Sequence, residues 1–169
     1  MKPFSIAALQ LDLNYSENYD LVAEKTYETC KRYPWVQMIV LSELAVGGSS
    51  MSLEFSLEKQ LPKFQKIAQE LNIWYIPGSF YDHVNDEVKN VAPVISPEGN
   101  LATTCAKTYP FLPYEKGIMP GLEPCIFEIT SLMPAASITA LTPPPAIIPV
   151  PWEAGLIITF DAPNFAITS

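Results

Sequence analysis

Short apolar runs and amphipathic segments alternate along the first half of the chain. Residues 4–11 form a mostly apolar run of strand length, and turn-prone residues follow it. Residues 18–32 place apolar side chains roughly on one face and charged side chains largely on the other, which predicts an amphipathic helix. Residues 36–41 are apolar almost throughout, as in a parallel strand buried on both faces. This order predicts a helix that covers a sheet.

The same alternation continues after residue 50. A second amphipathic helix is predicted over residues 62–71, because Pro62 suits a first helical turn and apolar side chains then recur at helical spacing. Pro97 and Gly99 suit a tight reversal between two strands, which predicts a β-hairpin. The further strands are predicted over residues 73–80, 90–96, 101–107 and 125–129. Together these elements predict the α/β fold class.

The composition changes abruptly after residue 129. Residues 130–169 contain no Lys or Arg, their only acidic residues are Glu153 and Asp161, and seven of the 17 prolines lie here. Because proline interrupts helices and removes donors from strand ladders, we expect neither a membrane helix nor regular structure over most of this segment. Its apolar side chains would stay exposed and favour aggregation. The sequence therefore predicts a folded domain over residues 1–129 and a poorly ordered tail over residues 130–169.

The chain carries a formal net charge of −8, from 10 basic and 18 acidic residues. Nucleic acids and anionic membrane surfaces select proteins with clustered Lys and Arg, so we expect no nucleic acid and no membrane as a partner. The N-terminal residues show no long apolar stretch with a small-residue cleavage site behind it. A cytoplasmic protein is therefore expected.

Cysteine and histidine are scarce in this chain. Cys30, Cys105 and Cys125 are odd in number and widely spaced, which predicts reduced thiols rather than a disulfide framework. His83 is the single histidine and lies in a polar run, so we predict a loop residue and no Ser-His-Asp triad. The sequence shows no metal-binding spacing, and we expect no metal and no cofactor.

Charged residues follow two of the predicted strands. Glu43 lies two residues after the strand of residues 36–41, and ligands of open α/β sheets bind at the carboxyl ends of strands. Lys107 and Glu115 lie eight positions apart in the loop of residues 107–121, KTYPFLPYEKGIMPG, whose three prolines stiffen it. Two plainer interpretations stay open: Glu43 caps the following turn, and Lys107 and Glu115 only solvate a surface loop.

Four segments, in order over about residues 4–129, resemble the nitrilase or carbon–nitrogen hydrolase superfamily. They are the strand IAALQLDL with Gln10, the strand MIVLSELAVGG with Glu43, the hairpin VISPEGNL leading to Lys107, and the loop KTYPFLPYEKGIMPG with Glu115 and Gly121. The loop is most similar to the aliphatic amidase and formamidase branch. The resemblance is specific because a strand-end Glu, a strand-end Lys and the proline loop occur together.

This resemblance implies a fold, a reaction and a set of site residues. The fold would be the N-terminal part of a nitrilase-like αββα sandwich, in a family of homo-oligomers. The reaction would be hydrolysis of the C–N bond of a small amide or nitrile by a Glu-Lys-Cys mechanism without a cofactor. Glu43 would be the general base, Lys107 would stabilise the oxyanion, and Glu115 would hold Lys107 and the substrate in register.

The sequence departs from the family at the nucleophile. The family carries its cysteine in a motif of the kind Ser-Ile-Cys-Tyr-Asp, whereas Thr139 stands at the cysteine's place here. No cysteine follows Cys125. Cys105 and Cys125 match no nucleophile position and are more typical of inert core thiols. We therefore expect a truncated, inactive carbon–nitrogen hydrolase, whose missing half would also leave one face of the sheet uncovered.

Two alternatives to this prediction stay open. In the first, the retained pocket binds a small amide or a partner subunit without catalysis. In the second, Thr139 replaces the cysteine as nucleophile. The second alternative is disfavoured, because a threonine hydroxyl is far harder to deprotonate than a thiol and a lone carboxylate is a poor base for it.

Overall fold

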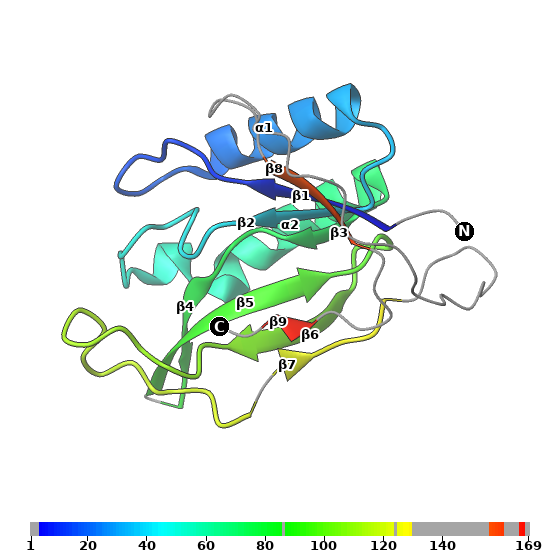
Figure 1. Cartoon of the computed structure of the whole chain (residues 1–169). Coiled ribbons are helices and arrows are strands. Elements are labelled where there is room, and N and C mark those ends of the chain that lie inside the picture. Colours follow the sequence, from blue (N-terminus) through cyan, green and yellow to red (C-terminus); the bar gives the residue numbers. More distant parts are fainter. Residues whose placement is uncertain (1–3, 86, 124, 130–155, 161–165, 168–169) are drawn as a thin grey trace.

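Seven strands form one mixed sheet with two helices packed against it (Figure 1). The computed structural model describes residues 4–85, 87–123, 125–129, 156–160 and 166–167. The sheet order is β4-β5-β3-β2-β1-β8, and β6 pairs with β5 outside this path. The strands are β1 (Phe4–Leu9), β2 (Met38–Leu41), β3 (Trp74–Ile76), β4 (Phe80–Val84), β5 (Glu87–Ile95), β6 (Leu101–Ala106) and β8 (Leu156–Phe160). β1, β2 and β3 are parallel, and the other pairs are antiparallel.

Both helices bury their apolar stripes on the same face of the sheet. They are α1 (Tyr19–Arg32) and α2 (Leu57–Leu71). Val22 of α1 and Phe64 of α2 belong to the same buried cluster as Ala7, Ile39 and Tyr75 of the central strands. The predicted α/β fold class, with two helices on one side of a sheet, is therefore confirmed (Figure 1).

The opposite face of the sheet is also buried. Side chains alternate between the faces of a strand, so Ile6 and Met38 point away from the helices. They form a second cluster with Trp74, and Phe127 and Ile129 pack against it. The prediction of an uncovered sheet face is therefore wrong for this cluster. After the loop that follows β6, the chain comes back over this face, and Phe127 and Ile129 pack against it.

The predicted strand over residues 73–80 is too long, because it ends with β3 and the chain breaks at Pro77 and Gly78 before β4 begins. Gly78 has φ +93°, and a Cβ there would lie 2.4 Å from the carbonyl oxygen of Ser42. β4 then turns back as a hairpin with β5. His83 lies in β4 with an exposed side chain, and its prediction as a loop residue is wrong.

Replacing Gly78 by alanine tests this close approach, and Gly117→Ala is the matched control. Gly117 has φ +95° but has no atom within 4 Å of the added Cβ. We expect the control to lower the free energy of unfolding by about 1 kcal/mol through backbone strain. Gly78→Ala should cost about 1–2 kcal/mol more, because a backbone carbonyl must move. Urea denaturation of both variants measures the difference, and equal losses would contradict the crowding at Ser42.

The second helix begins five residues earlier than predicted. Ser56 is its N-cap residue, and its carbonyl accepts from the N–H groups of Lys59 and Gln60. A short 3-10 helix, η1 (Leu53–Phe55), precedes it. Pro62 therefore lies inside the helix, where its ring removes one backbone donor. Burial of Leu57 and Phe64 in the core offsets this loss, so tertiary packing overrides the local signal.

Two strands occur within residues 130–169. β8 pairs antiparallel with β1 over five residues, and β9 (Ala166–Ile167) pairs with β7 (Cys125–Ile126). The sequence predicts neither β8 nor β9, although the five residues of β8 contain no proline and no charge. The rest of the predicted tail, including Thr139, lies outside the described residues. Within the described ranges, no helix combines the length and the hydropathy needed to cross a bilayer.

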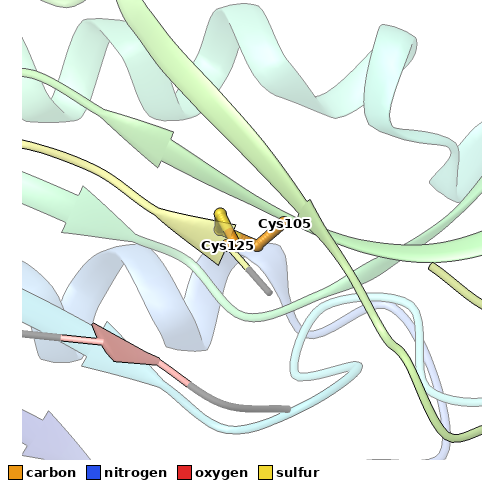
Figure 2. The surroundings of a disulfide bond; sticks show 2 residues. All are labelled: Cys105 and Cys125. Atoms are coloured by element: carbon orange, nitrogen blue, oxygen red, sulfur yellow. A yellow bond between two sulfur atoms is a disulfide. The ribbon is translucent and has the colours of Figure 1, made fainter. Parts of the chain in front are cut away.

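A disulfide joins Cys105 of β6 to Cys125 of β7, with their Cα atoms 5.3 Å apart (Figure 2). The prediction of reduced thiols is therefore wrong for this pair. The two cysteines are 20 positions apart, and the segment between them returns the chain beside β6, which their spacing in the sequence does not reveal. Cys30 is free on α1, and burial raises the pKa of its thiol to about 11. Cytoplasmic location stays a prediction.

Candidate functional site

The three predicted site residues come from two strand ends and one loop. Glu43 follows β2, Lys107 follows β6, and Glu115 lies in the loop after β6, the yellow-green loop in Figure 1. This loop is fastened to the sheet, because the Gly121 N–H donates to the Lys107 carbonyl at 2.8 Å and the Met119 N–H donates to a β5 carbonyl. The sheet edge and the loop therefore hold all three side chains in one region.

Glu43, Lys107 and Glu115 converge on one ammonium group. The Lys107 Nζ atom lies 2.7 Å from Glu43 Oε1 and 2.7 Å from Glu115 Oε2. Glu115 is 5% exposed, so the interpretation that it merely solvates a surface loop does not hold. Glu43 binds Lys107 across the sheet and does not only cap its own turn. The catalytic roles of the three residues stay predictions.

Glu115 uses both carboxylate oxygens as acceptors. Its Oε1 accepts from Asn90 Nδ2 at 2.9 Å and from the Tyr81 hydroxyl at 3.4 Å. Its Oε2 accepts from Lys107 and from the Phe111 N–H at 2.6 Å. Burial raises the pKa of the Glu115 carboxyl, but these hydrogen bonds outweigh burial, so its pKa is lowered. The Glu115 carboxylate is therefore ionised and held in place by its donors, and it has little capacity left to accept hydrogen bonds from a ligand.

Glu43 has a different environment from Glu115. Its side chain is 51% exposed, and only Oε1 accepts hydrogen bonds within the described part of the chain, from Lys107 and from Asn90. Among the described residues, none donates to Oε2. For Lys107, burial lowers the pKa of its ammonium, but hydrogen bonds to Glu115 and Glu43 raise it overall. The ammonium is therefore held charged between two carboxylates.

Asn90 and Tyr81 are site residues that the sequence did not single out. They face each other as cross-strand partners on β5 and β4. Asn90 had a detectable signal, since it lies on β5 in one row with Ala92 and Val94, and a polar side chain interrupts an apolar row. Tyr81 carried no such signal. Burial, and then the nearby charge of Glu115, raise the pKa of the Tyr81 hydroxyl.

A cavity of about 220 Å³ adjoins this cluster. Glu43, Asn90 and Lys107 line it together with Cys105 of the disulfide. The apolar side chains that line it come from β2, β3 and β5 and are Val40, Leu41, Ile76, Ala92 and Val94. Pockets for drug-sized ligands measure about 300–1,000 Å³, so this cavity suits a smaller molecule. It offers an apolar wall beside a cation and a carboxylate.

Other predicted features do not join this cluster. His83 lies on β4 with an exposed side chain, apart from the groups that line the cavity. Thr139 lies outside the described residues. In the ranges that the structure describes, no three His, Cys, Asp or Glu side chains are grouped so that they could hold a metal ion.

The fold of this chain is similar to that of solved carbon–nitrogen hydrolases. Against the carbon–nitrogen hydrolase from Helicobacter pylori G27 the TM-score is 0.61, with 23% identity over 70% of this chain and 44% of that one. Against an amidase from Nesterenkonia sp. it is 0.63, with 19% identity over 75% and 51%. Against Saccharomyces cerevisiae Nit3, a member of branch 10 of the nitrilase superfamily, it is 0.59, with 16% identity over 73% and 50%.

These likenesses show a shared fold. The chain spans about half the length of the structures that it matches. No protein-family model and no curated protein matches the sequence. The predicted nitrilase-like fold is therefore confirmed for part of the fold's length, from structure rather than from sequence similarity.

Proposed function

We propose that this chain is an inactive protein of the carbon–nitrogen hydrolase family, of the amidase type, whose site binds a small aliphatic amide without hydrolysing it. The observation that carries this proposal is the convergence of Glu43, Lys107 and Glu115 at a small apolar cavity. The Nesterenkonia amidase, which shares the fold, has been solved in variants with butyramide and with acrylamide bound. Both ligands combine a short carbon chain with a primary amide.

The charged groups complement the two ends of an amide. Lys107 has three N–H donors, and within the described part of the chain the two glutamates take two of them. The third donor suits the carbonyl oxygen of the ligand. Glu43 Oε2, which accepts no hydrogen bond from the described residues, suits an amide N–H. The alkyl group of the ligand would then lie against Val40 and Ile76, and its removal from water would stabilise the complex.

Hydrolysis by the family's mechanism would need a cysteine where this chain has Thr139. In the Glu-Lys-Cys mechanism that the resemblance implies, a cysteine thiol gives its proton to Glu43 and attacks the carbonyl carbon. Glu43 would pass that proton to the leaving nitrogen, so that the C–N bond breaks, ammonia leaves and a thioester remains, and water would then cleave the thioester to the acid and the thiol. No cysteine follows Cys125, and Cys105 is in a disulfide. The proposed function therefore ends at binding.

Butyramide binding and ammonia release test this proposal together. We expect butyramide to shift the NMR signals of Ala92 and Val94 with a Kd of about 1 mM, or about −4 kcal/mol. Lys107→Met should abolish these shifts, whereas Lys116→Met should keep them, because Lys116 is an exposed lysine of the same loop. Butyrate should bind more weakly, since its charge repels Glu43.

We expect no ammonia release above that of a sample without protein. Absence of any butyramide-dependent shift at the cavity would contradict the proposed binding. Ammonia release that Glu43→Gln abolishes would instead show that the chain catalyses hydrolysis, and the inactive assignment would be wrong.

A second candidate function is contact with a partner protein. It is favoured by a row of exposed large side chains on the site loop, which are Tyr109, Phe111, Leu112 and Tyr114. Phe111 and Tyr114 stack with ring centroids 5.3 Å apart, so together they present one apolar surface. Variants in which these four side chains are changed distinguish this function from the first. They should lose self-association or partner binding but keep butyramide binding.

A further inference from the structure

Asn90 is the least exposed polar group of the site. It lies in the central part of β5, and only 2% of its surface is exposed. Its Nδ2 atom lies 2.6 Å from Glu43 Oε1 and 2.9 Å from Glu115 Oε1. One side-chain amide group therefore donates to both carboxylates, which come from segments 72 residues apart in the sequence.

The orientation of the Asn90 amide is determined by its neighbours. If the oxygen and nitrogen were exchanged, the amide oxygen would face two carboxylate oxygens, and both contacts would be repulsive. In the observed orientation the Asn90 Oδ1 atom is buried and has no hydrogen-bond partner within the described part of the chain. A buried acceptor without a partner destabilises a fold. The stability of the fold alone therefore does not explain an asparagine at this position.

An apolar residue would suit this position better if packing were its only role. The neighbouring inward-facing residues of the same strand, Ala92 and Val94, are apolar and line the same cavity. Tyr81 faces Asn90 across the strand pair and also reaches Glu115. The polar side chain of Asn90 therefore contributes hydrogen bonds to the carboxylates rather than packing within the sheet.

The charges of the site explain what this amide does. Two carboxylates and one ammonium carry a net charge of −1, and the carboxylates repel each other. Lys107 contacts one oxygen of each carboxylate, and Asn90 donates one further hydrogen bond to each of them. For Glu43, whose side chain is half-exposed, these two donors on Oε1 also limit its rotamers and keep Oε2 available.

We propose that Asn90 is a positioning residue that holds the carboxylates of Glu43 and Glu115 together on Lys107 in the geometry that binds an amide. This inference rests on the proposed function for its ligand. Its structural part, the coupling of the two carboxylates by one side chain, can be tested without any ligand.

Asn90→Leu is the direct test, because it fills the same space and removes both donors. The ¹³C signal of the Glu115 carboxyl, followed against pH, should titrate about one pH unit higher than in the unchanged chain, since one donor to the ionised form is lost. The carboxyl of Glu98 accepts a hydrogen bond from Ser96 and not from Asn90, so its titration should not change. Butyramide affinity at pH 7 should fall about tenfold.

A buried asparagine outside the site serves as the matched control. Asn18 is 1% exposed, and within the described part of the chain its side chain bonds Asn14 and Val46. Asn18→Ala should lower stability but leave the Glu115 titration unchanged, as expected of a structural residue. If Asn90→Leu fails to fold, Asn90→Ser keeps one donor and should give a smaller shift in the same direction.

The outcomes separate the two proposals. An unchanged Glu115 titration in a folded Asn90→Leu variant, or in Asn90→Ser, would overturn the positioning role. A shifted titration in a chain that binds no butyramide would support Asn90 as the positioning residue and overturn the proposed function instead. A loss of butyramide affinity in Asn18→Ala equal to that in Asn90→Leu would show that general destabilisation, not positioning, explains the effect.

Discussion

Replacing Lys107 by methionine is expected to abolish amide binding and to lower the free energy of unfolding at pH 7 by about 3 kcal/mol. Methionine keeps most of the side-chain length but removes the charge. Glu115, whose side chain is 7% exposed, would then be an ionised group without its cation. Removing one partner of a fully buried ion pair costs about 3–5 kcal/mol, and we take the lower end because the exposed Glu43 is screened by water.

The loss should depend on pH in a defined direction. The pKa of Glu115 is lowered in the folded chain, so its stabilising contribution is present above the unfolded value of 4.5 and is lost as the pH falls through the folded pKa. The pKa of Lys107 is raised, so its contribution is present below the unfolded value of 10.5 and is lost as the pH rises through the folded pKa. The difference between the two chains should therefore be largest between these values.

Urea denaturation at pH 7 and at about pH 3 checks this prediction. The Lys107→Met chain should differ much less from the unchanged chain at the lower pH, where protonation of Glu115 removes the unpaired charge. Lys116→Met is the control, and it should change stability by less than about 0.5 kcal/mol because its side chain is exposed. Equal losses at both pH values would mean that lost packing, and not lost charge, destabilises the variant.

The elements that the sequence predicted well are those set by local pattern. β1, β2 and α1 each follow an apolar run or an amphipathic period of their own, and the structure places them within a few residues of the prediction. The hairpin of β5 and β6 follows from its turn residues. The break at Pro77 and Gly78 was missed, because apolar residues before it and Phe80 after it resemble one continuous strand.

The candidate site was predictable only where a single residue carried the signal. Glu43 and Lys107 stand at strand ends, and the resemblance of the loop pointed to Glu115. Asn90 acts through partners 47 and 25 positions away, and no local pattern encodes such contacts. The disulfide was missed for the same reason, since only the return of the loop brings its two cysteines together.

The disulfide and the charged site share one loop. Lys107 and Glu115 both lie between Cys105 and Cys125, so the disulfide closes the loop that carries two of the three charged groups. Backbone bonds from Gly121 to Lys107 and from Met119 to Val88 hold the same loop. Loss of the disulfide should therefore loosen the loop without unfolding the sheet.

Replacing both cysteines of the bridge by serine is accordingly expected to weaken both the fold and the site. Opening a loop of this size lowers the free energy of unfolding by about 3 kcal/mol in the chain-entropy model. Trypsin should cut faster after Lys116, which is exposed in the loop, and butyramide should bind about tenfold more weakly because Lys107 and Glu115 are held less firmly.

Cys30→Ser is the control for this experiment, because Cys30 lies on α1 outside the bridge. It should leave both the cleavage rate at Lys116 and the butyramide affinity unchanged. A dithiol reductant should reproduce the effects of the double variant in the unchanged chain and have no further effect on the double variant. If the reductant changes neither cleavage nor affinity while mass spectrometry shows that the bridge has opened, the backbone bonds alone hold the loop, and the disulfide does not organise the site.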